Sequence, residues 1–195
     1  METLIFATNN PHKVDEVRSV LKNRWDIQSL KDAGIEIDIP EPHNTLEANA
    51  REKSFTIYQM TGRNCFSEDT GLEVFSLGGA PGVKSARYAG EKASYEENTQ
   101  KLLLNLDGKS DRKAQFRTII SLFLDGAEYQ FEGICPGIII EEKKGAGGFG
   151  YDPVFVPDGD TRTFAEMNTA EKNKYSHRKK AMDKLILFLA NKNGR

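Results

Sequence analysis

The stretch Thr3-Leu4-Ile5-Phe6-Ala7-Thr8-Asn9-Asn10-Pro11-His12-Lys13 decides the fold class, because it predicts a strand, a tight turn and a helix in succession. Residues 3–7 form a short β-branched and aromatic run, which is typical of a buried strand. Asn10 is a good N-cap, and Pro11 is a good first helical residue. An apolar stripe at helical spacing follows, formed by Val14, Val17, Val20 and Leu21. The chain therefore opens as a βα unit.

The following segments continue this alternation of strands and helices. We expect strands over residues 26–30 and 64–67. Between them an isoleucine at every second position, 35 to 39, alternates with acidic residues until Pro40 breaks the run. A helix is expected from a Thr45 cap to about Met60, with Gly62 ending it. A second helix is expected after residue 94, where Ser94 and Glu97 form a capping-box pattern.

A hairpin is predicted in the second half of the chain. Residues 116–124 and 129–140 are strand-like, and Asp125-Gly126 between them is a strong turn signal. A last helix is expected from near Ser176. Early βα units with a late hairpin predict an α/β fold with a mixed rather than a purely parallel sheet. We expect residues 1–195 to form a single domain of two lobes.

Composition and charge exclude several classes of protein. Lys and Arg total 27 and Asp and Glu total 29, so a net charge of −2 gives no general attraction to nucleic acid or anionic membranes. The chain begins without a basic signal-peptide region, and its apolar run 185–190 is too short to span a bilayer. Cys65 and Cys135 cannot form a disulfide framework and are expected to be buried thiols. We predict a cytoplasmic protein without a membrane partner.

Common catalytic motifs are absent. The chain contains no P-loop, no Gly-x-Ser-x-Gly and no zinc-ligand spacing. Residues 145–150 do satisfy Gly-x-Gly-x-x-Gly, but a dinucleotide fold requires a helix directly afterwards, and Pro153 and a strand-like run follow instead. This loop is either a plain turn or part of a base pocket in which Phe149 stacks and Asp152 accepts hydrogen bonds.

Three groups of residues could carry chemistry. The turn Thr8-Asn9-Asn10-Pro11-His12-Lys13 joins a strand to a helix N-terminus, where backbone N–H groups and Lys13 could bind phosphate. The alternative is an ordinary surface turn. Near the C-terminus Lys172, His177 and Arg178 could donate to carbonyl oxygens of a base. The alternative there is a basic helix face capped by Ser176.

The third group is acidic. Glu68 and Asp69 follow a predicted buried strand, and Glu41 follows Pro40 in another segment. Carboxylates that converge from separate strand ends hold Mg²⁺ in many sites, together with substrate phosphates. A carboxylate that is not saturated by metal can deprotonate water. The alternative is a solvated strand end in which residues 69–71 form a turn.

Five motifs together resemble those of the inosine triphosphatase family, the non-canonical purine NTP pyrophosphatases, and most closely its bacterial branch acting on dITP and XTP. In family order they are Thr8-Asn9-Asn10-Pro11-His12-Lys13, Ser67-Glu68-Asp69-Thr70-Gly71-Leu72, the Gly-Gly-x-Pro-Gly…Ser-Ala-Arg-Tyr stretch 78–88, Gly147-Gly148-Phe149-Gly150-Tyr151-Asp152-Pro153, and Glu171-Lys172…Ser176-His177-Arg178. The resemblance covers the chain from residue 4 to about 189. One segment departs from it, because Ala48 stands where the family often has a second glutamate.

The resemblance implies a two-lobed α/β fold with a long mixed sheet, and a homodimer. It implies Mg²⁺-dependent hydrolysis of purine nucleoside triphosphates, ITP, dITP and XTP, to the monophosphate and pyrophosphate, which cleanses the nucleotide pool.

By position, the resemblance makes Asp69 the general base and a metal ligand, with Glu41 as a second metal contact. It places the phosphate path along Thr8, Asn9, Asn10, Pro11, His12, Lys13, Lys53 and Thr70. It forms the base pocket from Phe149, Gly150, Tyr151, Asp152, Lys172, His177 and Arg178.

Other functions stay open on the sequence alone. A Maf-like pyrophosphatase of similar fold would act on pyrimidine nucleotides. A nucleic-acid-binding module could use the basic tail, since residues 161–195 contain nine basic and three acidic residues, including Lys179 and Lys180. A third alternative is a silent relative that only senses nucleotides. The overall charge argues against nucleic acid as a partner.

Overall fold

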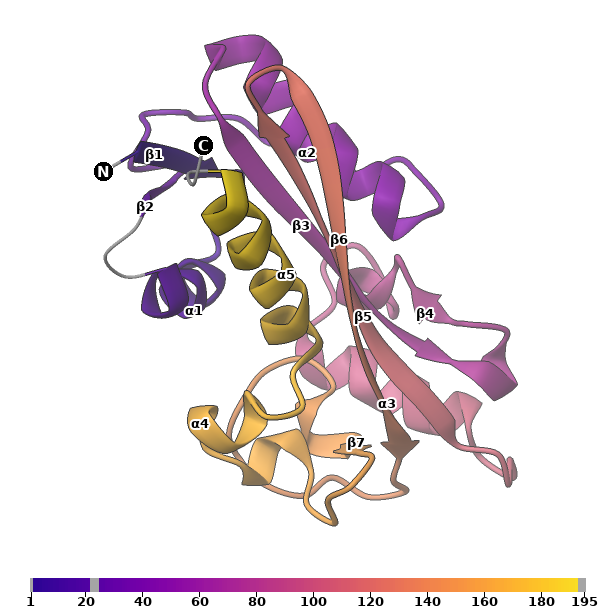
Figure 1. The fold of residues 1–195 in the computed structure, drawn as a ribbon. Helices are drawn as coiled ribbons and strands as arrows, with labels where there is room; N and C mark the ends of the chain where they lie inside the picture. The colour runs from indigo at the N-terminus through magenta and orange to yellow at the C-terminus, as the bar shows by residue number, and fades with distance from the viewer. Residues whose placement is uncertain (1, 22–24, 193–195) are drawn as a thin grey trace. The chain divides into compact units, whose positions relative to one another are not determined.

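The computed structural model describes residues 2–21 and 25–192. Within these ranges one seven-stranded sheet has the order β2-β1-β3-β5-β6-β7, with β4 paired to β3 (Figure 1). The strands are β1 (Glu2–Phe6), β2 (Trp25–Ser29), β3 (Cys65–Val74), β4 (Pro81–Gly82), β5 (Lys113–Leu124), β6 (Ala127–Ile139) and β7 (Phe155–Pro157). The α-helices are α1 (Pro11–Leu21), α2 (Leu46–Thr61), α3 (Tyr95–Asn105), α4 (Thr169–Lys172) and α5 (His177–Lys192).

The sheet is mixed, as predicted. β1 runs parallel to both β2 and β3, whereas β4 is antiparallel to β3 and β7 is antiparallel to β6. Short 3₁₀ helices complete the described fold: η1 (Phe75–Leu77), η2 (Ser85–Arg87), η3 (Asp152–Val154) and η4 (Phe164–Glu166). The combination of flanking helices and a mixed sheet confirms the predicted α/β class.

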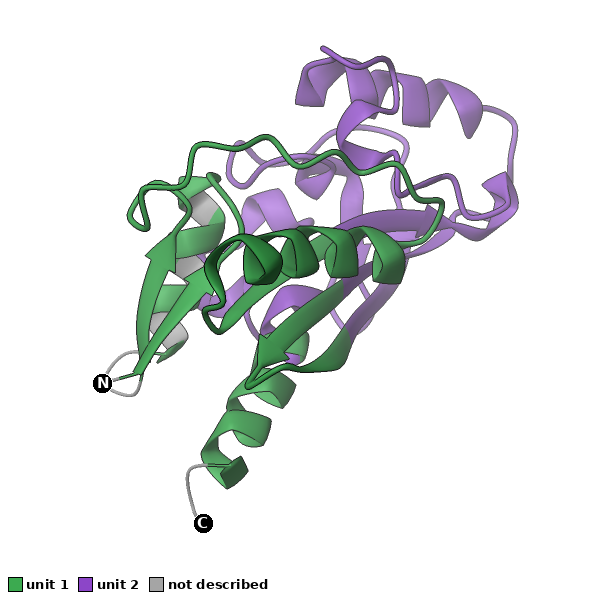
Figure 2. Ribbon diagram, turned by 90° about the horizontal axis from the view of Figure 1, so that it is seen from above, with its two compact units in different colours: residues 1–69, 119–132, 181–195 green, residues 70–118, 133–180 purple. Residues whose placement is uncertain are grey.

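The chain divides into two compact units, drawn in two colours in Figure 2. Unit 1 contains residues 1–69, 119–132 and 181–195, and its strand β1 is buried on both faces. Leu4 and Phe6 pack in a cluster with α1 and α5, while Ile5 lies in a second cluster with Ile57 of α2. Successive strand residues point to opposite faces, so helices on both sides explain the continuous apolar run at residues 4–7.

Unit 2 contains residues 70–118 and 133–180 and has its own core. The far end of β3 contributes Leu72 and Val74, and α3 contributes Leu102 and Leu106. Aromatic residues from the second half of the chain complete this core, namely Tyr151, Phe155 and Phe164 with Phe116 of β5. This core supports the loop that carries residues 145–153.

Local signals in the sequence predicted the element ends well. Thr45 Oγ1 accepts from Ala48 N, and Gly62 ends α2 with a left-handed φ of 63°. Ser94 and Glu97 form the predicted capping box of α3. The turn between β5 and β6 has positive φ at both Asp125 (52°) and Gly126 (84°), as a two-residue hairpin turn requires.

The first helix also begins as predicted. Asn10 Oδ1 accepts from Lys13 N at 3.4 Å, which caps α1 at Pro11. Val14, Val17 and Leu21 are buried, and the side chain of Val20 lies outside the described part of the chain.

The expected end of one strand was wrong. β3 does not end before Glu68 but continues through Asp69-Thr70-Gly71 to Val74, because Leu72 pairs with Gly82 of β4. Residues 35–39 form no strand, although Ile35 is buried and Ile37 and Ile39 pack against the same cluster. The alternation of isoleucine and acidic residues places the isoleucines on one side of an extended segment, which is not paired with a neighbouring strand in the described part of the chain.

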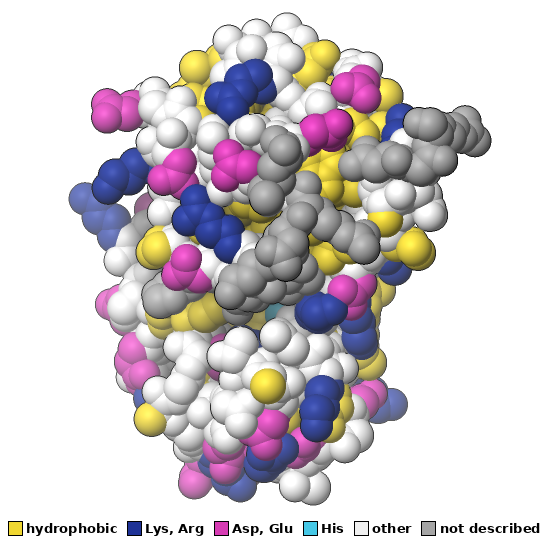
Figure 3. Space-filling view, turned by 60° about the vertical axis from the view of Figure 1, so that its left-hand side comes forward, with side chains coloured by type: hydrophobic (Ala, Val, Ile, Leu, Met, Phe, Trp, Pro, Cys, Tyr) yellow, Lys and Arg dark blue, Asp and Glu magenta, His cyan; other side chains and the backbone are white. Residues whose placement is uncertain are grey.

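Two lysines of the basic C-terminal helix α5 donate hydrogen bonds to the backbone of β6. Lys180 Nζ donates to Ile134 O at 2.9 Å and Lys184 Nζ to Glu132 O at 2.6 Å, both on β6. On the face shown in Figure 3, Lys and Arg side chains are interspersed with Asp and Glu side chains. None of the described helices is long and apolar enough to cross a membrane.

Candidate functional site

Glu68 and Asp69 are consecutive residues of β3, so their side chains point to opposite faces of the strand. On one face Glu68 Oε1 lies 3.1 Å from Lys13 Nζ in the first turn of α1. On the other face Asp69 Oδ1 lies 3.4 Å from Lys53 Nζ of α2. Both carboxylate residues are buried. Each lysine that the resemblance assigns to the phosphate path therefore has a carboxylate partner of its own.

Lys53 also brings Glu41 into this cluster. Its ammonium donates to Glu41 Oε1 at 2.6 Å, so it bridges two carboxylates from different segments. The segment containing Glu41 is held by Asn49, whose Oδ1 accepts from His43 N at 2.9 Å and whose Nδ2 donates to His43 O at 3.1 Å. The structure thus places Glu41, Lys53 and Asp69 together in unit 1.

Burial and charge compete in this cluster. Burial raises the pKa of Asp69, and Glu41 raises it further, while the positive charge of Lys53 acts against both. Burial acts to lower the pKa of Lys53, but Asp69 and Glu41 together outweigh it and leave the pKa raised. Lys53 therefore stays cationic, and Asp69 is a more basic carboxylate than an exposed aspartate.

The donor set fits a hard divalent cation. Within the described residues Asp69 Oδ2 is buried and has no hydrogen-bond partner, although such an oxygen requires one or a cation. The described ranges contain no group of three or more His, Cys, Asp and Glu side chains that could hold an ion by themselves, so a cation here would rest on two carboxylates. Mg²⁺ commonly takes one or two carboxylates and completes its shell with water and substrate phosphates. Asp69 and Glu41 match that pattern.

The turn before α1 is ordered by its own side chains. Thr8 Oγ1 accepts from Asn10 N at 3.2 Å, and Asn10 Oδ1 accepts from Lys13 N. These bonds fix the helix N-terminus next to Lys13, where backbone N–H groups favour an anion. The side chain of His12 lies outside the described part of the chain. Thr70, the residue after Asp69, shares a hydrogen bond of 2.7 Å with Thr118 through their hydroxyl oxygens.

A second cluster lies in unit 2, around Lys172. Its ammonium donates to Asp152 Oδ2 at 2.7 Å and lies 5.0 Å from the ring centre of Phe149. Asp152 Oδ2 also accepts from Phe149 N at 2.9 Å. The guanidinium carbon of Arg178 lies 5.7 Å from the same ring. The ring of Phe149 can stack on a base, and the Lys172 ammonium and Arg178 guanidinium over that ring can donate hydrogen bonds to carbonyl oxygens.

The other residues predicted for the base pocket lie in the same unit, with different contacts. His177 is buried at the start of α5 and stacks on Phe116 at 4.7 Å. Tyr151 is buried too, and its hydroxyl donates to Ser85 O at 2.8 Å, so it anchors the loop. Gly150 adopts a left-handed φ of 62°. Ser176 Oγ accepts from Lys179 N at 3.3 Å, which confirms the predicted helix cap.

Sequence reasoning missed Phe164, whose ring centre lies 5.2 Å from Lys172 Nζ. A signal was present, because Thr163 and Glu166 have capping-box spacing and form that box around η4. It also missed Tyr95, whose ring lies 6.2 Å from that of Phe149. No local pattern links residue 95 to residue 149.

Both cysteines are free and buried, as predicted. Burial raises the pKa of Cys65 to about 12 and that of Cys135 to about 12. Thiols of this kind are inert at neutral pH, so neither cysteine enters the candidate chemistry.

Comparison with known proteins identifies the family. The sequence model of the Ham1 family matches residues 4–188. The chain belongs to the Ham1 family. Every residue predicted for the site lies inside the matched range. A dITP/XTP pyrophosphatase of Porphyromonas gingivalis is 50% identical over 190 residues, which cover 97% of this chain and 98% of that protein.

Further members of the Ham1 family agree with this match. A dITP/XTP pyrophosphatase of Flavobacterium psychrophilum is 48% identical over 188 residues, covering 96% of this chain and 99% of that protein. The solved structure of the Ham1 protein of Staphylococcus aureus has a TM-score of 0.92 and 35% identity, and covers 98% of this chain and 100% of that one. The α/β fold described above is therefore the Ham1 fold.

Proposed function

We propose that this chain hydrolyses the non-canonical purine nucleoside triphosphates ITP, dITP and XTP to the nucleoside monophosphate and pyrophosphate. Membership of the Ham1 family and its similarity to dITP/XTP pyrophosphatases that are 50% and 48% identical support the substrate class. The observation that carries the chemistry is the buried Asp69, with one oxygen beside Lys53 and the other without a hydrogen-bond partner among the described residues.

Asp69 is the general base in this proposal. Water attacks the α-phosphorus, Asp69 takes the proton, and the bond from the α-phosphorus to the bridging oxygen breaks to release pyrophosphate. Burial raises the pKa of Asp69, which makes it a stronger proton acceptor than an exposed aspartate. Mg²⁺, held by Asp69 and Glu41 when bound, supplies positive charge that offsets the charge of the triphosphate.

Two lysines and one helix end act on the phosphates. Lys53 and Lys13 exchange carboxylate partners for phosphate oxygens as charge develops on the leaving pyrophosphate. The backbone N–H groups at the start of α1 add further donors, within the path formed by Thr8, Asn9, Asn10, Pro11, His12, Lys13, Lys53 and Thr70.

The second cluster reads the base. Phe149 stacks on the purine, and Lys172 and Arg178 donate to the carbonyl at C6 of hypoxanthine or xanthine. Adenine has an amino group at that position, so the donors would face another donor. A mismatched buried donor costs about 1–3 kcal/mol, which disfavours ATP. Gly150, Tyr151, Asp152 and His177 shape the pocket.

The general-base assignment is tested by Asp69→Asn. We expect turnover of ITP to fall below detection while ITP binding, measured by calorimetry with Ca²⁺, stays within a fewfold of the wild type. Glu73→Gln is the matched control, because Glu73 lies on the same strand and faces Arg117 at 3.8 Å. Near-normal turnover in Asp69→Asn would remove the general-base role.

Two finer features belong to the same proposal. We propose that the protein works in the cytoplasm, where nucleotide pools are cleansed, and that it forms a homodimer. Sedimentation velocity of the purified full chain tests the second point, and a monomer at micromolar concentration contradicts it.

A further inference from the structure

Lys172 stands at the end of a helix too short to hold it in place. α4 contains only Thr169–Lys172, and a single turn has little stability of its own. The capping box between Asn168 and Glu171 closes the turn, with Glu171 N donating to Asn168 Oδ1 and Glu171 Oε2 accepting from Asn168 N. The position of Lys172 therefore depends on what the turn is attached to.

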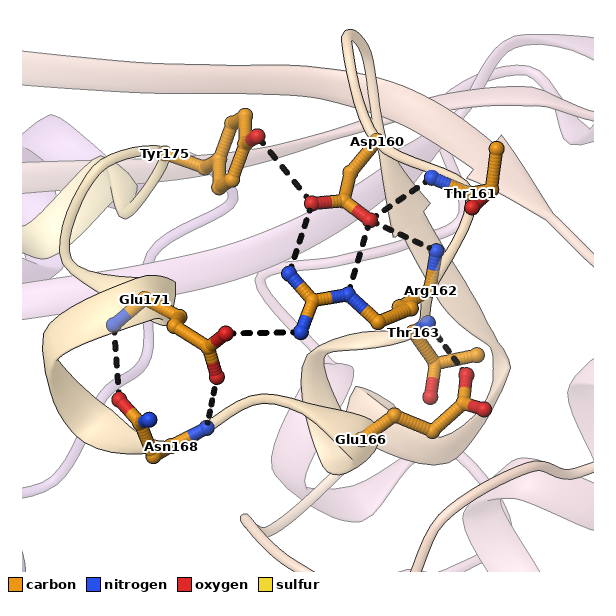
Figure 4. A network of polar contacts seen from close by, with 8 residues as sticks. All are labelled: Asp160, Thr161, Arg162, Thr163, Glu166, Asn168, Glu171 and Tyr175. Carbon is orange, nitrogen blue, oxygen red and sulfur yellow. Dashed lines mark hydrogen bonds and ion pairs between the residues drawn. The ribbon is translucent and has the colours of Figure 1, made fainter.

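Arg162 attaches it. The guanidinium Nη1 donates to Glu171 Oε1 at 2.8 Å, while Nε and Nη2 donate to the two oxygens of Asp160, each at 3.2 Å (Figure 4). Glu171 is thus bonded at both oxygens, once to its own turn and once to Arg162. The planar guanidinium fixes the angle between Asp160 and Glu171, which a lysine ammonium cannot do.

A second tie lies on the other side of Lys172. The Tyr175 hydroxyl donates to Asp160 Oδ2 at 3.2 Å. Asp160 is itself fixed, because its Oδ1 accepts from Thr161 N at 2.8 Å and from Arg162 N at 2.9 Å. The segment that carries Lys172 is therefore fastened one residue before and three residues after it. We call Asp160, Arg162, Glu171 and Tyr175 the Arg162 clamp.

The loop that carries Arg162 also places an aromatic ring next to the Lys172 ammonium. Phe164 follows Arg162 by two residues, and its ring centre lies 5.2 Å from Lys172 Nζ. Thr163 Oγ1 donates to Lys144 O at 2.8 Å, which ties the loop to the start of the glycine-rich segment. Segments 144–152, 160–166 and 168–175 thus meet around one ammonium group.

Stability alone does not explain the clamp. The side chains of Arg162 and Glu171 are 41% and 32% exposed, and ion pairs at such sites contribute little to folding. The clamp instead fixes geometry. Hydrogen bonds to Arg162 lower the pKa of Glu171 and of Asp160, so both carboxylates stay charged and keep their bonds to the guanidinium.

We propose that Arg162 is a positioning residue, which through the clamp sets where Lys172 lies and so how strictly the enzyme prefers purines with a 6-carbonyl group over adenine. This inference rests on the proposed function, because Lys172 reads the base only if the chain is a purine nucleotide pyrophosphatase. Arg162 itself need not touch the nucleotide.

The test compares Arg162→Gln, Arg162→Lys and Tyr175→Phe with the wild type. We expect Arg162→Gln to lower kcat/KM for ITP about ten- to a hundredfold and to leave kcat/KM for ATP nearly unchanged, because displacing a positioned group by about 1 Å costs that much. Arg162→Lys should restore part of the ITP:ATP ratio. Tyr175→Phe, which removes only one hydroxyl, should shift the ratio in the same direction by less.

The matched control is Arg18→Gln in unit 1. Arg18 also bridges two segments, with Nη2 donating to Asp32 Oδ2 at 2.6 Å and to Ile27 O at 2.9 Å. Its effect on the melting temperature should be as small as that of Arg162→Gln, and the ITP:ATP ratio should stay unchanged. A general loss of stability would move both variants alike.

Hydrogen exchange of the backbone amides of residues 168–175 gives a readout that does not depend on turnover. Faster exchange there in Arg162→Gln, and not in Arg18→Gln, is the expected result. An unchanged ITP:ATP ratio in Arg162→Gln, or unchanged exchange, overturns the positioning role. Wild-type protein that hydrolyses neither ITP nor XTP counts against the proposed function instead, and exchange then decides whether the clamp positions Lys172.

Discussion

The ammonium of Lys172 and the Oδ2 of Asp152 lie 2.7 Å apart, with side chains only 14% and 5% exposed. The same oxygen accepts from Phe149 N, so one carboxylate binds both the Lys172 ammonium and the backbone of the residue that carries the stacking ring. A buried carboxylate would be costly without these donors. In our account this pair reads the base, while Asp69 and Lys53 act on the phosphates.

Lys172→Met should remove the reading of the base. We expect kcat/KM for ITP to fall at least about a hundredfold. We also expect a loss of about 3–5 kcal/mol of unfolding free energy, because Asp152 loses its buried partner. Lys174→Met, the same substitution two residues away on an exposed side chain, is the control for both measurements. If both variants keep wild-type kinetics, Lys172 does not contact the nucleotide.

Gly148→Ala tests the position of Asp152. Gly148 has a φ of +73°, and a Cβ there would collide with the Asp152 side chain, so alanine must displace the carboxylate. We expect kcat/KM for ITP to fall about a hundredfold. Gly78→Ala is matched, because Gly78 has a φ of +65° in open space and bears only the backbone strain of about 1–2 kcal/mol. Equal activity of the two variants would contradict the assigned role of Asp152.

Asn49→Asp tests whether the segment with Glu41 must be held in place. The fully buried amide of Asn49 donates to His43 O. A carboxylate in its place has no proton to donate to that carbonyl oxygen. We expect a loss of about 1–3 kcal/mol in stability and a higher Mg²⁺ concentration for half-maximal activity.

Asn98→Asp is the control for that variant. Asn98 is also buried and also bridges a loop, accepting from Ala89 N at 2.7 Å and donating to Ala86 O at 3.0 Å. It should lose similar stability with an unchanged Mg²⁺ requirement. A matching rise in its Mg²⁺ requirement would show that destabilisation, rather than Glu41, causes the effect.

The two thiols give a prediction about pH. Burial raises the pKa of Cys65 and Cys135 to about 12, so at pH 8 only about one thiol in ten thousand is ionised. The native protein should react with a disulfide reagent far more slowly than the unfolded chain in urea, where about a quarter of the thiols are ionised. Rapid labelling of two thiols in the native protein at pH 8 contradicts this burial.

Local signals predicted most of the fold because their partners lie a few residues apart. Thr45 and Gly62 mark the ends of α2, and Asp125-Gly126 turns the hairpin, through contacts within one turn of chain. Asp69-Thr70-Gly71 has the composition of a turn but lies inside β3. Gly71 is there because a Cβ would collide with the Gly82 carbonyl on β4, a contact eleven residues away that no local pattern contains.

The candidate site shows the same division. Motif order pointed to Asp69 and Lys172 as candidates, and strand alternation alone could have assigned Glu68 and Asp69 to opposite faces. The Arg162 clamp could not be predicted, because Asp160, Glu171 and Tyr175 converge only through the path of two irregular segments. Phe164 joined the site for the same reason.

Phosphate release from ITP and XTP tests the central claim most directly, measured with Mg²⁺ in the presence and absence of added inorganic pyrophosphatase, with ATP and GTP alongside. The account predicts phosphate from ITP and XTP only when the coupling enzyme is present, which means cleavage between the α- and β-phosphates, and far less from ATP. Phosphate released without the coupling enzyme, or a preference for pyrimidine triphosphates in a parallel panel, would contradict it.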